Sequence, residues 1–271
     1  MDMRPIGVFD SGLGGLTAVR ELRQILPAEN LVYFGDTARV PYGMRTREEL
    51  IGFCRQDVNF LRGFDLKAIL IACGTATTAA LPVLQAENGL PIVGVVEPAV
   101  RRALAASRNK KIGLIATQAS VRSGAYEAAL RQLDSGAEMV SLACPKFVPL
   151  IESGHFLPGD EAIESVAREY LVPLKETGID TLILGCTHYP LLTEIVAEIM
   201  GEGVTLVSAG GESAYAVRRL LEDQGLLNLS RRRGETRFFV SGDAEEFAKN
   251  GSVFLKEELA GRVGRVDIEQ Y

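Results

Sequence analysis

A cysteine, a threonine and a histidine lie together in the segment "LGCTHYP", at Cys186, Thr187 and His188. The apolar run before them, residues 180–184, predicts a buried strand, and residues 191–200 have the spacing of a helix. The three side chains therefore follow the end of a strand and precede a helix. A thiol beside an imidazole could act as a nucleophile or as an acid and base. The alternative is that Cys186 is a small apolar filler, as most buried cysteines are.

A second cysteine has the same setting in the first half of the chain. Cys73 ends the apolar run of "ILIACGTATT", and Thr75 follows it closely, as Thr187 follows Cys186. The two cysteines are 113 positions apart. A filler cysteine has no reason to recur at a matching position, so the pair favours chemistry at a shared site.

The elements that must position these residues alternate short apolar runs with longer helical patterns. Such alternation predicts βαβ units and a mostly parallel sheet. We expect strands at residues 6–9, 31–34, 68–72 and 91–96, and again at residues 112–116, 139–143, 181–184 and 204–208. Each strand of the second set begins 106 to 113 positions after its counterpart in the first. Any α/β chain alternates in this way, but the near-constant offset indicates two halves with one topology.

Both cysteines lie at the carboxyl ends of predicted strands, where ligands bind in open α/β sheets. If a pseudo-two-fold axis relates the halves, the two thiols face each other across one cleft. Inverting a carbon centre requires one group to remove a proton from one face and another to deliver a proton to the opposite face. The matched cysteines therefore indicate a racemase or an epimerase. A helix N-terminus can favour the thiolate, and His188 could assist Cys186 as a base or a hydrogen-bond partner.

The end of the first predicted strand adds polar groups to the same rim. In "FDSGLGGLTAV", Asp10 and Ser11 precede glycines that permit a tight turn, whose N–H groups could hold a carboxylate. A dinucleotide fingerprint fails because threonine replaces its last glycine. A phosphate-binding loop and a helix N-cap at Asp10 remain as alternatives. Thr117 and Ser120 occupy the matching rim of the second half, and residues 41–43 could form a loop over the cleft.

The remaining cysteines and the other histidine have no such setting. Cys54 lies in a helical pattern, and Cys144 follows a strand without a partner in the first half, so we expect both to be structural. We expect His155 to lie in a loop. The spacing of the four cysteines and two histidines supports neither a disulfide framework nor a zinc site.

The bulk composition excludes several classes of function. The chain has 271 residues, 47% of them hydrophobic, which is enough for a packed core in one large domain or two small ones. No run approaches the ~18 apolar residues of a membrane span, and the first residues do not resemble a secretory signal, so we expect no membrane partner. A net charge of −6 argues against nucleic acid as a partner, and the basic residues 230–235 are expected to form a solvated turn.

Seven segments resemble those of the glutamate racemases, cofactor-independent members of the aspartate/glutamate racemase family. They are "FDSGLGGLTAV", "GDTARVPYG", "LIACGTATT", "GVVEPAV", "LIESG", "LGCTHYP" and "FFVSGDAEEF", and their order spans nearly the whole chain. The resemblance implies an α/β fold with two pseudo-symmetric three-layer domains, mostly parallel sheets, and an active site in the cleft between them. Residues 1–97 with 209–271 would form the first domain, and residues 98–208 the second.

The resemblance also implies an activity, the interconversion of L-glutamate and D-glutamate by a two-base proton transfer at Cα. Cys73 would serve the D-glutamate side and Cys186 the L-glutamate side. Asp10, Glu152 and His188 match positions thought to assist the thiols. The positions that match substrate contacts are Asp10, Ser11, Tyr42, Gly43, Gly74, Thr75, Thr187 and His188.

This chain departs from the family pattern at Gly74, where the family usually has asparagine. Any contact made by Gly74 would come from its backbone N–H. The resemblance further implies that neither pyridoxal phosphate nor a metal is needed. It also implies that D-glutamate is supplied for peptidoglycan in a bacterial cytoplasm, and that the protein is a homodimer.

Three alternatives remain open. The chain could be a racemase for aspartate or another acidic amino acid. It could be a cysteine hydrolase or amidase that uses Cys186 and His188, which would leave Cys73 unexplained. It could also be a two-lobed binding protein without catalysis, although such proteins are usually exported.

Overall fold

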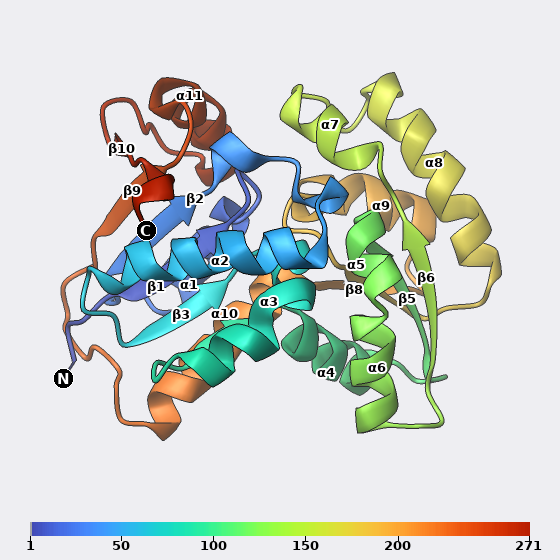
Figure 1. Cartoon of the computed structure of the whole chain (residues 1–271). Coiled ribbons are helices and arrows are strands. Elements are labelled where there is room, and N and C mark those ends of the chain that lie inside the picture. The colour runs from blue at the N-terminus through green and yellow to red at the C-terminus, as the bar shows by residue number, and fades with distance from the viewer. Residues whose placement is uncertain (1) are drawn as a thin grey trace.

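The computed structural model describes residues 2–271, and its strands form two parallel sheets. The first sheet contains β1 (Ile6–Asp10), β2 (Leu31–Gly35), β3 (Ala68–Ile71), β4 (Ile92–Gly94), β9 (Thr236–Val240) and β10 (Val263–Arg265). The second contains β5 (Lys111–Ala116), β6 (Glu138–Ala143), β7 (Thr181–Leu184) and β8 (Thr205–Ser208). Figure 1 shows the sheets in two lobes, which we call the first lobe and the second lobe.

The strand orders confirm the prediction of two halves with one topology. The first sheet has the order β10-β9-β2-β1-β3-β4, and the second has the order β6-β5-β7-β8. The arrangement β2-β1-β3-β4 therefore recurs as β6-β5-β7-β8. All eight predicted strands are present, with ends that differ by at most two residues. Strands β9 and β10 were not predicted, and they extend only the first sheet.

Helices cover both faces of each sheet, which confirms the three-layer α/β class. In the first lobe, α1 (Leu16–Ile25), α10 (Ala209–Asp223) and α11 (Ala244–Leu255) lie on one face, and α2 (Arg47–Arg62) and α3 (Gly74–Glu87) lie on the other. In the second lobe, α8 (Glu161–Glu176) and α9 (Thr193–Met200) lie opposite α4 (Val96–Ala106) and α6 (Ala125–Leu133). The short helices are α5 (Gln118–Ser123), α7 (Phe147–Glu152), η1 (Thr37–Arg39), η2 (Tyr42–Met44), η3 (Tyr189–Leu192) and η4 (Ile268–Gln270).

The side chains of β1 and β3 alternate between the two layers of core, because successive residues of a strand point to opposite faces. Val8 and Leu70 pack with residues of α1 and α10, whereas Phe9 and Ile71 pack with residues of α2. Burial on both faces explains why these strands are continuous apolar runs in the sequence. The polar residues that follow each strand therefore lie at one edge of the sheet.

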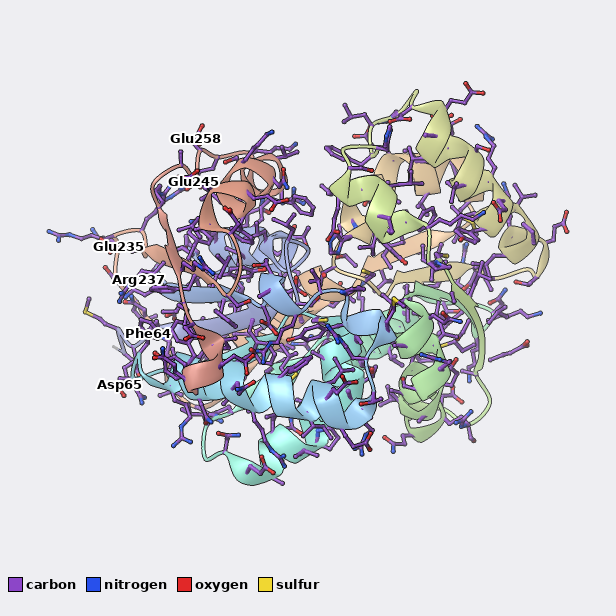
Figure 2. All side chains as sticks on the ribbon, turned by 45° about the horizontal axis from the view of Figure 1, so that its top comes forward. Phe64, Asp65, Glu235, Arg237, Glu245 and Glu258 are labelled. Atoms are coloured by element: carbon purple, nitrogen blue, oxygen red, sulfur yellow. The ribbon has the colours of Figure 1, made fainter. Side chains whose placement is uncertain are left out.

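The outer edge of the first lobe is formed by the added strands. The guanidinium of Arg237 lies 5.0 Å from the centre of the Phe64 ring, and Figure 2 labels both residues far from the second lobe. Two connections join the lobes, from β4 to α4 and from β8 to α10. Among residues 2–271, no helix combines the length and the apolar character that a membrane crossing requires.

Candidate active site

Cys73 lies between β3 and α3, as predicted. It is the N-cap of α3, and its Sγ accepts a hydrogen bond of 3.4 Å from the backbone N–H of Ala76. The thiol donates to Oγ of Ser11, 3.7 Å away. Burial and, to a smaller extent, the negative charge of Asp10 together raise the pKa of the Cys73 thiol to about 12. Burial and Asp10 therefore outweigh the lowering of the thiol pKa that we expected from the helix N-terminus, and Cys73 carries its proton at neutral pH.

Cys186 follows β7 in the turn formed by residues 185–188, which we call the Cys186 turn. This turn leads into the short helix η3, and α9 begins only at Thr193. Sγ of Cys186 lies 3.7 Å from Nδ1 of His188, and Nε2 of His188 lies 3.0 Å from Oε1 of Glu152. The three groups therefore form a chain in which the imidazole links the thiol to a carboxylate.

His188 has the electrostatic character of a cation. Burial alone would lower its pKa, but the hydrogen bonds to Cys186 and Glu152 outweigh burial and raise the pKa to about 10. At neutral pH the ring is an imidazolium. The two cysteines therefore differ, since Cys73 is held as a thiol and Cys186 faces a cation.

Asp10 fixes the loop between β1 and α1. Its buried carboxylate accepts hydrogen bonds from the backbone N–H groups of Gly12, at 3.1 Å, and Gly15, at 2.8 Å. The N-cap alternative is wrong, because Gly15 occupies that position of α1. Burial raises the pKa of Asp10, while the charge of His188 and the N–H groups oppose this rise. Asp10 thus lies within electrostatic reach of the second lobe.

The same loop touches the Cys186 turn directly. A methyl group added at Gly14 would overlap Nδ1 of His188 and Oγ1 of Thr187, so a glycine is required for this approach. Thr17 Oγ1 donates to the carbonyl oxygen of Thr187 at 2.9 Å. The structure therefore places the loop that follows β1 against the turn that follows β7.

Hydroxyl groups also link the two lobes. Thr75 Oγ1 lies 3.0 Å from Thr117 Oγ1, which in turn lies 3.0 Å from Ser120 Oγ. Thr75 belongs to the first lobe, and the other two residues belong to the second. The expectation that Thr117 and Ser120 lie at the matching rim is confirmed.

The loop that carries Tyr42 and Gly43 is anchored by a buried cluster of ionisable side chains. The Tyr42 hydroxyl donates to Asp36 Oδ2 at 2.5 Å and lies 3.3 Å from Asp57 Oδ2, so it is already engaged. Arg39 joins the same two carboxylates, at 2.7 Å and 3.1 Å. Gly43 has open space around its Cα. A ligand contact in this loop would therefore come from the backbone of residues 42 and 43.

Sequence reasoning missed the cluster formed by Asp36, Arg39 and Asp57. One signal was present, because Asp57 falls on the face of α2 that also presents Leu50, Cys54 and Leu61 to the core. An acidic residue on an apolar helix face must find a buried partner. Nothing comparable in the sequence marks Asp36 or Arg39.

The remaining cysteines and His155 lie apart from these contacts. Cys54 is buried in α2, and Cys144 is buried after β6, as expected of structural residues. Burial raises the pKa of both thiols. His155 lies in a loop, with Nδ1 2.8 Å from Asp160 Oδ2. All four cysteines are free, and no cluster of three or more metal-binding side chains is found within residues 2–271.

Comparisons with known proteins agree on one family. The profile of the Asp/Glu/Hydantoin racemase family matches residues 6–214. A curated glutamate racemase from Geobacter metallireducens is 42% identical over 269 residues, which is 99% of this chain and 98% of that protein. A crystal structure of glutamate racemase isoform RacE1 from Bacillus anthracis has a TM-score of 0.94 and 37% identity, covering 98% of both chains. A structure from Francisella tularensis in complex with D-glutamate has a TM-score of 0.90 and 36% identity, covering both chains completely.

Proposed function

The chain belongs to the Asp/Glu/Hydantoin racemase family, and we propose that it interconverts L-glutamate and D-glutamate. The relatives that are similar over their full length are glutamate racemases, and one of the similar structures holds D-glutamate. This activity makes the protein an amino-acid racemase, and racemases are isomerases.

The observation that carries the mechanism is the difference between the surroundings of the two cysteines. Cys73 keeps its proton because its pKa is about 12, whereas Cys186 lies beside an imidazolium. A thiolate on Cys186 removes the Cα proton of L-glutamate, so that a C–H bond breaks and an S–H bond forms. The thiol of Cys73 then delivers its proton to the opposite face of Cα and becomes a thiolate. The reverse reaction, from D-glutamate, begins with this second protonation state.

Three further residues support the two thiols. His188 contacts Cys186 and stabilises its negative charge, and Glu152 holds His188 through the 3.0 Å contact. Glu152 therefore acts as a positioning residue. Asp10 fixes the loop that brings Ser11 to Cys73, and its charge favours the protonated thiol.

The substrate's polar groups need donors near the two sulfur atoms. The hydroxyl groups of Ser11, Thr75 and Thr187 lie on the rims already described, and backbone N–H groups of residues 42, 43 and 74 add to them. We assign these groups, with Asp10 and His188, to substrate binding. Hydroxyl and N–H donors suit the two carboxylates of glutamate.

We also propose the setting of the enzyme. Similar glutamate racemases come from the bacteria Geobacter metallireducens, Listeria monocytogenes and Bacillus anthracis, which supports a role in supplying D-glutamate for peptidoglycan in a bacterial cytoplasm. The two thiols supply both proton transfers, so the proposed reaction requires neither pyridoxal phosphate nor a metal. We propose that the functional unit is a homodimer whose active sites each lie between the two lobes, with domains at residues 1–97 plus 209–271 and 98–208.

Incubation of the purified protein with L-glutamate in D2O, without added cofactor and with a chelator present, tests the proposal. Circular dichroism follows the loss of optical activity, and NMR follows entry of deuterium at Cα. We expect racemisation to stop in Cys73→Ala and in Cys186→Ala, and to persist in Cys54→Ala. Full turnover by either of the first two variants would refute the two-base mechanism. Faster racemisation of L-aspartate than of L-glutamate would reassign the substrate.

A further inference from the structure

The loop between β1 and α1, formed by residues 11–15, lies against side chains of both lobes. Oγ of Ser11 lies 3.7 Å from Sγ of Cys73, in the first lobe. Gly14 lies against the imidazole of His188, in the second lobe, because a Cβ atom built on Gly14 would overlap Nδ1 of that ring. A displacement of this loop would therefore change the surroundings of a thiol in one lobe and of an imidazole in the other.

Tyr33 holds this loop through its hydroxyl group. The residue belongs to β2, which pairs with β1, and its side chain is fully buried. The hydroxyl donates a hydrogen bond of 2.6 Å to the carbonyl oxygen of Gly12, while Asp10 accepts from the N–H of the same glycine at 3.1 Å. A Cβ atom built on Gly15 would lie 3.0 Å from the hydroxyl oxygen, so the hydroxyl also lies beside the end of the loop. Both polar backbone groups of Gly12 are therefore fixed by side chains of the first sheet.

The ring of Tyr33 is held separately from its hydroxyl group. Its centre lies 6.1 Å from that of Phe238 and 6.0 Å from that of Phe247, and both of these rings are buried. Burial and, to a smaller extent, the charge of Asp10 raise the pKa of Tyr33 well above its ordinary value. The hydroxyl therefore keeps its proton at neutral pH and remains a donor. Exchange of this tyrosine for phenylalanine would leave the ring contacts in place and remove only the hydrogen bond to Gly12.

We propose that Tyr33 is a positioning residue that holds the loop of residues 11–15 in contact with Cys73 and His188. The inference rests on the proposed racemase function, because that function gives these two side chains a part in proton transfer. A buried carbonyl group that loses its donor must find water or another partner. In a close-packed interior either change displaces the backbone of Gly12, and with it the rest of the loop.

The kinetics of Tyr33→Phe test the proposal. A misplacement of about 1 Å near reacting groups costs roughly 10²-fold in rate, so a shift of half that distance costs roughly tenfold. We therefore expect kcat of Tyr33→Phe to fall roughly tenfold with L-glutamate and with D-glutamate. KM should change less, because the donors of the Tyr42 loop, Thr75 and Thr187 lie outside residues 11–15. An unchanged kcat, or a loss confined to KM, would overturn the inference.

Phe238→Leu is the matched control. It disturbs the packing of the same buried ring but leaves the Tyr33 hydroxyl and its hydrogen bond in place. We expect its kcat to match that of the wild type. A loss as large as that of Tyr33→Phe would assign the effect to ring packing and contradict the proposal. Each measurement is repeated in sucrose, which favours the compact folded state. If sucrose restores the kcat of Tyr33→Phe, the loss came from instability, and the inference fails.

NMR of the histidine rings provides a readout that does not depend on activity. Because Gly14 lies against the His188 ring, displacement of the loop should shift the ring signals of His188 in Tyr33→Phe. The signals of His155, the only other histidine, should stay unchanged, since it lies in the loop after α7. Unshifted His188 signals would show that the loop has not moved and would rule out the proposed role of Tyr33. A wild-type protein that does not racemise glutamate would instead refute the proposed function.

Discussion

The contact between Glu152 and His188 predicts how the imidazole titrates. Glu152→Gln keeps the size of the side chain and removes its charge. A hydrogen bond to a charged group contributes about 1.5–3 kcal/mol, and the 40% exposure of the Glu152 side chain places this one at or below the lower end of that range. About 1.4 kcal/mol corresponds to one pKa unit. We therefore expect the pKa of His188 to fall from about 10 by roughly one pKa unit.

NMR titration measures this change directly, because the chain has only two histidines. A His155→Gln variant assigns the signals. Glu169→Gln is the matched control, since Glu169 pairs with Lys146 at an exposed site. If His188 titrates alike in Glu152→Gln and the wild type, the ion pair does not set its pKa. If Glu169→Gln produces the same shift, the effect is one of overall charge. In the racemase assay, the alkaline limit of L-glutamate turnover should move down by the same amount.

Three further predictions concern stability, each measured by urea unfolding. Burial and the charge of Asp36 raise the pKa of Asp57 well above its ordinary value, so the folded protein retains a proton that the unfolded chain releases above about pH 4. This difference destabilises the fold increasingly as pH rises, and Asp57→Asn should therefore gain stability relative to the wild type between pH 4 and pH 8. Lys67→Met should lower the free energy of unfolding by about 3–5 kcal/mol, because it leaves the buried carboxylate of Glu29 without its partner; Oε2 of Glu29 lies 2.5 Å from the Lys67 ammonium. The double variant Lys67→Met with Glu29→Gln should lose less stability. Phe147→Ala should lower the free energy of unfolding by about 3–5 kcal/mol, because the buried Phe147 ring packs against the rings of Tyr170 and Tyr189. Phe53→Ala should lower it less, because the Phe53 ring is only partly buried.

The strands could be predicted from the sequence where each one is a continuous run of apolar residues. Buried parallel strands are continuous apolar runs, and β1, β3, β5 and β7 all have this form. Strand β9 begins with Thr236 and Arg237 and was missed, because three of its five residues are exposed or partly exposed. Its place in the sheet depends on pairing with β2, some 205 positions away, which no local pattern encodes.

The contacts of the site could be predicted where they join residues that are close together in the sequence. Cys186 and His188 are two positions apart, so their contact follows from the turn that holds them. The contact between His188 and Glu152 joins residues 36 positions apart, and only the family resemblance pointed to Glu152. The protonation of Cys73 could not be predicted, because it depends on burial by both lobes and on the charge of Asp10.

The pairing of β2 with β9 also affects the order in which the chain can fold. Every strand of the second sheet comes from residues 111–208, whereas the first sheet joins Leu31 to Thr236. Closing so long a loop is entropically unfavourable, and distant contacts form slowly. The second sheet can form all its pairings before the ribosome has synthesised β9. The first sheet, which supplies Cys73, is therefore the later of the two to be completed, so the surroundings of Cys73 are finished after those of Cys186.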